Sequence, residues 1–190
     1  MPWTVLSRRQ ALIGLLASVL CSTIAGCPGK SGTLTVKVSR EEIQRRLDAT
    51  FPVDQQVLLT RVVLEHPKVI LTNGSDRIGV GLDVRVEIPI VGPRSGSVTV
   101  SGGIDYRREQ KAFFLRDPKL EQIQVEGLTA EQLGLVKSPL ESVTTAALTV
   151  FPIYEFKQRN VGEITAEHVL RKVYVKDGNV YAELGLPTSK

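Results

Sequence analysis

Residues 77–90, RIGVGLDVRVEIPI, carry an apolar side chain at every even position, and glycine, proline or a charged residue at every odd one. Alternation with a period of two is typical of a β-strand that buries one of its faces. At roughly 3.3 Å per residue this stretch would extend about 46 Å, whereas typical strands contain only about 5–6 residues. A sheet of such long strands twists and has to curl in order to bury its apolar face, so something must fill the curl.

The segments around this stretch continue the strand pattern. Residues 97–106 again alternate, with valine, isoleucine or tyrosine at most even positions and mainly serine, threonine and aspartate at the odd ones. Asn73-Gly74 is a strong signal for a hairpin turn. Pro67 lies inside a predicted strand, where it requires a sheet edge, a bulge or a break, because proline has no N–H to donate. Together, residues 57–128 predict an antiparallel meander with one face in water.

A helix from Pro139 to about residue 150 is expected to fill the curl. Ser138 fits the N-cap of this helix, Pro139 its first position and Glu141 its third. Glu141 is its only charged residue, although a helix exposed to solvent normally shows a charged stripe. We therefore expect the sheet to enclose this helix. Thr129 and Gln132 have the spacing of a capping box and predict a separate short helix before it.

These elements predict an α+β fold in which a long curved antiparallel β-meander wraps around the C-terminal α-helix as a half-barrel. A strand at residues 33–38 and a helix with Ser39 and Glu42 as its capping box precede the meander. A hairpin that turns at Asp177-Gly178 closes the chain. We assign residues 33–190 to a single domain, because 42% hydrophobic residues suit one globular domain of this length.

Residues 1–26 have the features of a bacterial export signal. Arg8 and Arg9 precede an apolar run at residues 11–20, and no acidic residue precedes the run. The run is about half of the roughly 20 residues that a membrane-spanning helix requires. We therefore expect a cleaved signal peptide and no permanent span.

Both cysteines of the chain lie near the end of this signal. Ile24-Ala25-Gly26-Cys27 resembles the lipobox of bacterial lipoproteins, in which a signal peptidase cuts before a cysteine that carries a diacylglyceryl thioether. We expect lipid attachment at Cys27 and a tether at residues 27–32. A Cys21–Cys27 disulfide is the alternative, but its loop would lie inside a signal and stabilise nothing. Pro28 is not the aspartate that resembles an inner-membrane retention signal in enteric bacteria, which favours a periplasm-facing place at the outer membrane.

Charge and motifs argue against several classes of function. The loss of Arg8 and Arg9 with the signal lowers the net charge of +4 by two units, and no aromatic residues interleave with the short Lys/Arg runs, so we expect no nucleic-acid partner. The two histidines, His66 and His168, lack further ligands at metal-binding spacing. The chain also lacks a G-x-S-x-G motif. We expect no enzyme, no metal and no cofactor.

The order of the elements resembles that of the YceB-like family of bacterial lipoproteins, a family grouped as a domain of unknown function. The likeness covers essentially the whole chain after the signal and includes SREEIQRRL (39–47), FFLRDPKLEQIQVEGL (113–128), LESVTTAALTVFPIYEF (140–156) and ITAEHVLRKVYVKDGNV (164–180). It implies a fold similar to tubular lipid-binding (TULIP-like) domains, in which a curved sheet wraps around a long helix. The resemblance supplies no ligand residues to carry over to this chain.

We expect a lipid or fatty acid to bind in an elongated apolar channel between the sheet and the helix. A tube of the predicted length could house an acyl chain, because half of the roughly 30 Å hydrocarbon core of a bilayer is about one lipid tail long. The expected lining comes from the inward faces of the strands, from the helix and from the segment that follows it: Val80, Leu82, Val84, Val86, Val98, Val100, Leu140, Val143, Ala147, Tyr154 and Phe156.

A solid core is the alternative to a channel, since a chain of this length buries roughly 70% of its unfolded surface without a ligand. In that case Tyr154 and Phe156 plug the end of the core, whereas beside a channel they would line its mouth. The protein would then be a non-enzymatic structural or interaction lipoprotein. In both cases we expect a monomer held at the membrane by its N-terminal lipid.

Overall fold

The computed structural model describes residues 33–89, 91–156 and 169–186. Contacts divide the chain between Ser31 and Gly32, and every described residue lies in the unit Gly32–Lys190. The predicted export signal, the attachment residue Cys27, the tether and His168 lie outside the described residues.

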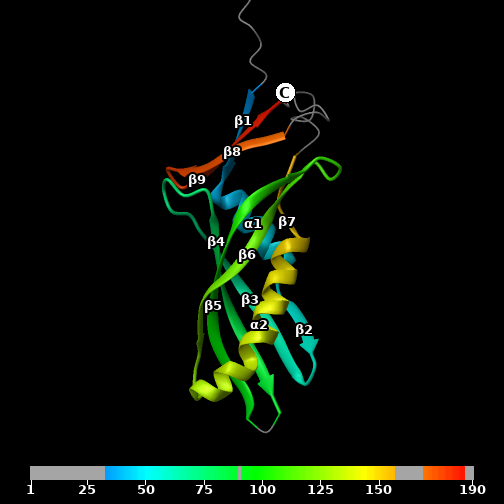
Figure 1. The fold of residues 1–190 in the computed structure, drawn as a ribbon, viewed down its shortest axis with the longest axis vertical. Helices are drawn as coiled ribbons and strands as arrows, with labels where there is room; N and C mark the ends of the chain where they lie inside the picture. Colours follow the sequence, from blue (N-terminus) through cyan, green and yellow to red (C-terminus); the bar gives the residue numbers. More distant parts are fainter. Residues whose placement is uncertain (1–32, 90, 157–168, 187–190) are drawn as a thin grey trace, which may run out of the picture. The chain divides into compact units, whose positions relative to one another are not determined.

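The described residues form nine strands and two helices, shown in Figure 1. In chain order they are β1 (Thr33–Ser39), α1 (Arg40–Thr50), β2 (Val53–Val57), β3 (Thr60–Ile70), β4 (Ile78–Ile88), β5 (Gly92–Arg107), β6 (Ala112–Val125), α2 (Ala130–Val150), β7 (Pro152–Glu155), β8 (Val169–Lys176) and β9 (Asn179–Gly185).

The strands form a six-stranded sheet, β2-β3-β4-β5-β6-β7, and a three-stranded sheet, β1-β9-β8. All neighbouring strands are antiparallel. Residues 78–88 of the stretch RIGVGLDVRVEIPI form β4, in which every even residue from Ile78 to Ile88 is buried. The two sheets meet where the turn before β4 exchanges backbone hydrogen bonds with β8: Gly74 N donates to Val175 O, and Val175 N donates to Ser75 O, each at 2.8 Å. The predicted meander is therefore confirmed.

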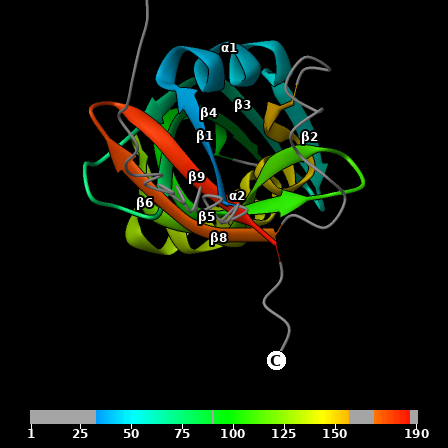
Figure 2. The same cartoon turned by 90° about the horizontal axis from the view of Figure 1, so that it is seen from above.

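The large sheet curls around α2. The helix contacts β6 on one side and β2 and β3 on the other, although β4 and β5 separate these strands in the sheet. Figures 1 and 2 show α2 against the concave side of the strands. The predicted α+β half-barrel is confirmed, with α1 packed against β3 and β7.

Helix α2 corrects two predictions. It is one continuous helix that begins after the N-cap Thr129, so Ser138 is not an N-cap and no separate short helix precedes it. Pro139 lies inside the helix, where it removes the hydrogen bond that the Leu135 carbonyl would otherwise accept. The helix continues because Val136, Leu140 and the residues after them keep an apolar face of helical spacing buried in the core.

The sheet encloses only one face of α2, although the sequence predicted full enclosure. Leu135 is 68% exposed and Val150 64% exposed on the outer face, and the charged residues Glu131, Lys137 and Glu141 of α2 are exposed too. The inner face holds one buried polar side chain, Thr144, whose hydroxyl donates to the Leu140 carbonyl at 2.6 Å. This local hydrogen bond explains how a threonine is tolerated in the core.

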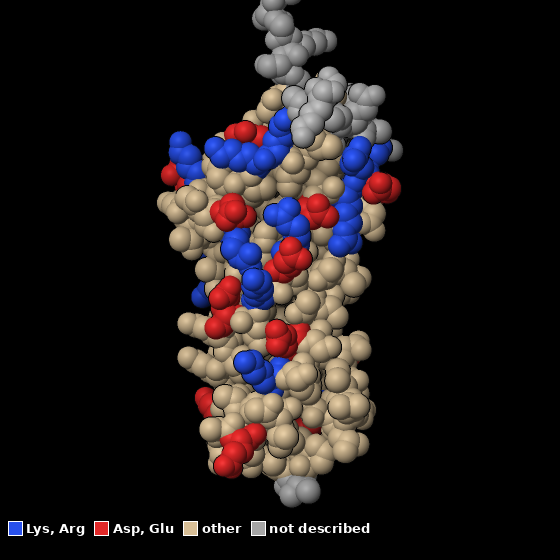
Figure 3. All heavy atoms as spheres, in the orientation of Figure 1, with Lys and Arg blue, Asp and Glu red and all other residues tan. Residues whose placement is uncertain are grey.

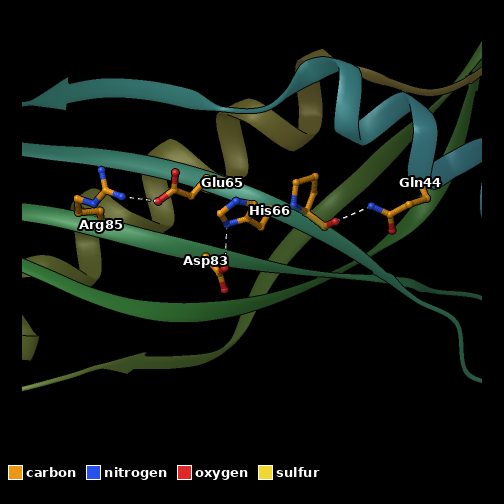
Figure 4. Close-up of polar contacts among 6 residues, drawn as sticks. Gln44, Glu65, His66, Asp83 and Arg85 are labelled. Atoms are coloured by element: carbon orange, nitrogen blue, oxygen red, sulfur yellow. Dashed lines mark hydrogen bonds and ion pairs between the residues drawn. The ribbon is translucent and has the colours of Figure 1, made fainter.

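A β-bulge in β3 satisfies the constraint that Pro67 places on the strand. The register shifts between Glu65 and Lys68, and His66 adopts a left-handed backbone with φ of 49°. Gln44 of α1 bridges the bulge, because its Nε2 donates to the Pro67 carbonyl at 2.5 Å and its Oε1 accepts from Val69 N at 2.9 Å. Figure 4 shows this side chain reaching from the helix to the strand. The bulge thereby positions α1 on the sheet.

Candidate functional site

The side chains predicted to line a channel gather in one hydrophobic core. All of them except Tyr154 are buried there, and Tyr154 packs against it: Val80, Leu82, Val84, Val86, Val98, Val100, Leu140, Val143, Ala147 and Phe156. Val80, Val86 and Leu140 are 0% exposed. Side chains on the wall of a water-sized cavity would keep accessible surface, so atoms fill the space around these three residues. A ligand-lining role for the set stays a prediction.

A groove lies instead along the seam between β6 and the N-terminal half of α2. It has a volume of about 480 Å³ and is lined by Leu120 and Ile123 of β6 and by Leu133 and Gly134 of α2, with polar residues around them. A Cβ built at Gly134 would meet nothing within 4 Å, so the absent side chain leaves the seam open. Three half-buried apolar side chains thus form the floor of an open groove.

A second hollow of about 540 Å³ adjoins this seam around the end of β6. It shares Ile123 and Leu133 with the first and adds Val125 of β6 and Ser95–Ser97 of β5. Both volumes fall in the range of about 300–1,000 Å³ that small-molecule pockets usually have. The two hollows therefore form one site, which we call the α2–β6 groove.

Sequence reasoning missed Leu133 and Leu120 as site residues. The capping box at Thr129 and Gln132 predicts a separate short helix, and that prediction implies no contact between Leu133 and the sheet. Helix α2 brings it there because the helix runs unbroken from Ala130 through Pro139. Figure 3 shows that charged side chains gather over the upper part of this face of the molecule and are sparser over the lower part, where α2 lies in Figure 1.

Four aromatic rings close the core beyond the C-terminal end of α2. Phe113 and Tyr154 are paired on neighbouring strands, and Tyr106 pairs with Phe113 on the other side. The Phe156 ring lies 5.0–5.6 Å from the other three rings, near-perpendicular to each of them. Edge-to-face packing at this separation is favourable. Burial raises the pKa of the Tyr106 phenol.

Tyr154 and Phe156 therefore belong to a cluster that plugs the end of the core. Both also line a hollow of about 350 Å³ between β7 and α1, whose other side carries Arg45, Arg46 and Glu42. Arg46 forms an ion pair with Glu155 at this place. The position of the two aromatic residues fits the plug that the sequence offered as one alternative, and a role at a channel mouth stays a prediction.

The described residues around His66 do not form a catalytic or metal-binding arrangement. Its Nδ1 lies 3.1 Å from Asp83 Oδ2, and the two side chains are 75% and 61% exposed. Figure 4 shows this pair beside the Glu65–Arg85 ion pair on the outer face of the sheet. Within residues 33–89, 91–156 and 169–186, no three His, Cys, Asp or Glu side chains are grouped so that they could hold a metal ion. Among these residues, no helix has the length and apolarity needed to cross a bilayer.

These features define a class: a curled-sheet domain whose apolar interior is closed by one helix, with an open groove along the seam. The sequence model of the family described as "Protein of unknown function (DUF1439)" matches residues 38–179, which run from the end of β1 to the start of β9. The chain belongs to this family. The comparison with curated proteins gives no match.

Proposed function

We propose that this chain is a bacterial envelope lipoprotein that binds a lipid or another hydrophobic ligand in the α2–β6 groove. The observation that carries the proposal is the groove itself, where Leu120, Ile123 and Leu133 remain half-buried beside the hydrophobic core. Binding of an acyl chain there would remove apolar surface from water, which contributes about 25 cal/mol of favourable free energy per Å² buried. The likeness of the chain to the YceB-like lipoproteins, and through them to TULIP-like lipid-binding domains, supports the same proposal.

Pro139 offers a route from the groove to the interior. It lies between the part of α2 that carries Leu133 and the part that carries Leu140, and it weakens the helix where the Leu135 carbonyl lacks its partner. An outward swing of residues 130–138 would uncover Val136 and Leu140 from the groove side. The ligand then replaces the contacts of the displaced turns, so the channel predicted from the sequence forms only with the ligand in place.

The anchor in this proposal is a lipid on Cys27. Because β1 begins at Thr33, residues 27–32 would hold the half-barrel close to the membrane surface. Pro28 favours the outer membrane, facing the periplasm. Metabolic labelling with radioactive palmitate should mark the wild-type chain and leave a Cys27→Ser variant unmarked, and membrane fractionation should find the labelled chain in the outer membrane. Equal labelling of the variant would contradict the anchor.

Two leucines on the same helix provide a matched test of ligand binding. Leu133 faces the groove, whereas Leu135 is 68% exposed on the outer face of α2. A charge at Leu133 would have to be desolvated by a bound acyl chain, so Leu133→Asp should weaken uptake of a fluorescent fatty acid at least tenfold. Leu135→Asp should leave uptake unchanged.

Circular dichroism spectra that match the wild type would establish that both variants fold. Two results would refute the proposal: a wild-type chain that takes up neither fatty acid nor phospholipid, or equal loss of uptake in the two variants.

A second candidate function is that of a non-enzymatic interaction lipoprotein with a solid core. The complete burial of Val80, Val86 and Leu140 favours it, and so does the outer face of α2, where Leu135 and Val150 are exposed. Photo-crosslinking from position 150 in intact cells should then capture one reproducible protein, while the fatty-acid assay stays blank. We propose no enzymatic activity, and a turnover abolished by substitution of His66 or His168 would contradict that.

A further inference from the structure

A second groove, separate from the α2–β6 groove, lies where the two sheets meet. It has a volume of about 490 Å³ and shares no residue with the groove beside α2. Strand β8 forms one wall and the C-terminal part of β5 the other, with Arg116 of β6 and Asp76 of the β3–β4 connection at its borders. We call it the inter-sheet groove.

Cationic residues from two strands and one turn line the inter-sheet groove. Arg108 follows β5, Arg116 comes from β6, and Arg171 and Lys172 come from β8. The Arg116 guanidinium lies over Gly103, since a Cβ built at Gly103 would come 3.2 Å from Arg116 Nη2. Glycine at this position therefore lets the guanidinium lie close to the strand. These cationic residues are not one basic run in the sequence, and the fold brings them to the same groove.

The lining of the groove holds four cationic residues and two carboxylates. Asp76 and Asp105 also line it, and Asp105 lies 3.9 Å from Arg107, which is outside the lining. Among the residues that the structure describes, no carboxylate forms an ion pair with Arg116, Arg171 or Lys172. Arg171 donates to the Leu186 carbonyl, and Lys172 Nζ lies 5.3 Å from the centre of the Tyr174 ring. The residues that line the groove therefore carry an excess of positive charge, which favours an anion.

Apart from Tyr106, the remaining lining residues are apolar. Ile104 is buried, while Leu170 and Val173 are half-buried and line the wall that β8 provides. Cations beside an apolar wall suit a ligand with an anionic head and an apolar body. Arginine in particular recognises phosphate oxygens through its planar fork of donors.

We propose that the inter-sheet groove binds a phosphate group, held by Arg116, Arg171 and Lys172. The group is carried by a phospholipid, whose glycerol and first methylenes lie against Leu170 and Val173, or it is a free phosphate. This site does not depend on ligand binding in the α2–β6 groove.

The test uses the full chain purified in a neutral detergent. Native mass spectrometry counts the phosphatidylglycerol and diacylglycerol molecules bound, and calorimetry measures the affinity for inorganic phosphate. Arg116→Gln combined with Lys172→Gln should weaken binding of the anionic probe about 100-fold, roughly tenfold for each cation removed. Arg94→Gln combined with Lys119→Gln removes the same charge from positions outside the groove and should leave binding unchanged.

The arms of the experiment separate the sources of phosphate. Binding of phosphatidylglycerol but not of inorganic phosphate supports a lipid head group, and tight binding of inorganic phosphate supports a soluble ligand. Equal binding of phosphatidylglycerol and diacylglycerol, equal loss in the two double variants, or no binding of any probe would overturn the proposal. Loss of fatty-acid uptake in Leu133→Asp leaves this result untouched, so the two proposals can fail separately.

Discussion

Leu140 tests whether the interior of the half-barrel is filled by protein atoms. The side chain is 0% exposed and packs on the inner face of α2. Leu140→Ala removes three buried carbon atoms, which contribute about 2.4 kcal/mol at about 0.8 kcal/mol each. A cavity left in a close-packed core adds about 1 kcal/mol, so we expect the free energy of unfolding to fall by about 3 kcal/mol.

The same substitution at Leu135 is the control, because this leucine lies on the same helix and is 68% exposed. Leu135→Ala should change the free energy of unfolding by less than about 0.5 kcal/mol. Both variants are compared with the wild type in residues 32–190, by urea unfolding followed by far-ultraviolet circular dichroism and linear extrapolation. A loss below about 1 kcal/mol for Leu140→Ala would refute the reasoning, because it would mean that the space around Leu140 is already loose.

Three further substitutions test features of the backbone and of the buried groups. Leu58 has a φ of 56° in the two-residue loop between β2 and β3 and is 87% exposed. Because asparagine adopts this left-handed backbone more readily than leucine, Leu58→Asn should raise the free energy of unfolding, measured in urea, by about 0.5–1 kcal/mol. An unchanged or lower value would contradict the assigned strain. Gln44→Ala should lower it by about 1–3 kcal/mol, because the buried Val69 N–H loses its acceptor, while the exposed Gln56→Ala serves as control. Since burial raises the pKa of Tyr106, its contribution to stability is complete below the ordinary tyrosine pKa of about 10 and is lost as the pH rises through the folded-state value. Urea midpoints between about pH 8 and 11 should therefore fall less in Tyr106→Phe than in the wild type, and parallel curves would exclude this role.

Local sequence rules predicted the long strands well. The alternation of β4 is visible in the sequence because its period matches the pleat of a strand, and the structure buries the same residues. Pro67 predicted an interruption of the strand because proline has no N–H to donate to the neighbouring strand, and the structure has a β-bulge between Glu65 and Lys68. Capping boxes at Ser39 and Thr129 are present as expected.

Local rules failed where distant segments decide the outcome. Ser138 and Pro139 together look like the start of a helix, but tertiary packing of Val136 on the core carries the helix through the proline. The α2–β6 groove depends on how that helix lies on β6. The inter-sheet groove is lined by both Arg116 and Arg171, which no spacing in the sequence predicts because they belong to different sheets.

The pairing of β1 with β9 also has a consequence for biogenesis. These strands are bonded from Thr33 opposite Gly185 to Ser39 opposite Asn179, so the first described strand has the last one as its neighbour. Since translation proceeds from the N-terminus, β1 emerges long before its partner and must wait with the apolar side chain of Val38 uncovered. A chain cut short before residue 179 could not complete the small sheet, which makes full-length synthesis a precondition for the native state.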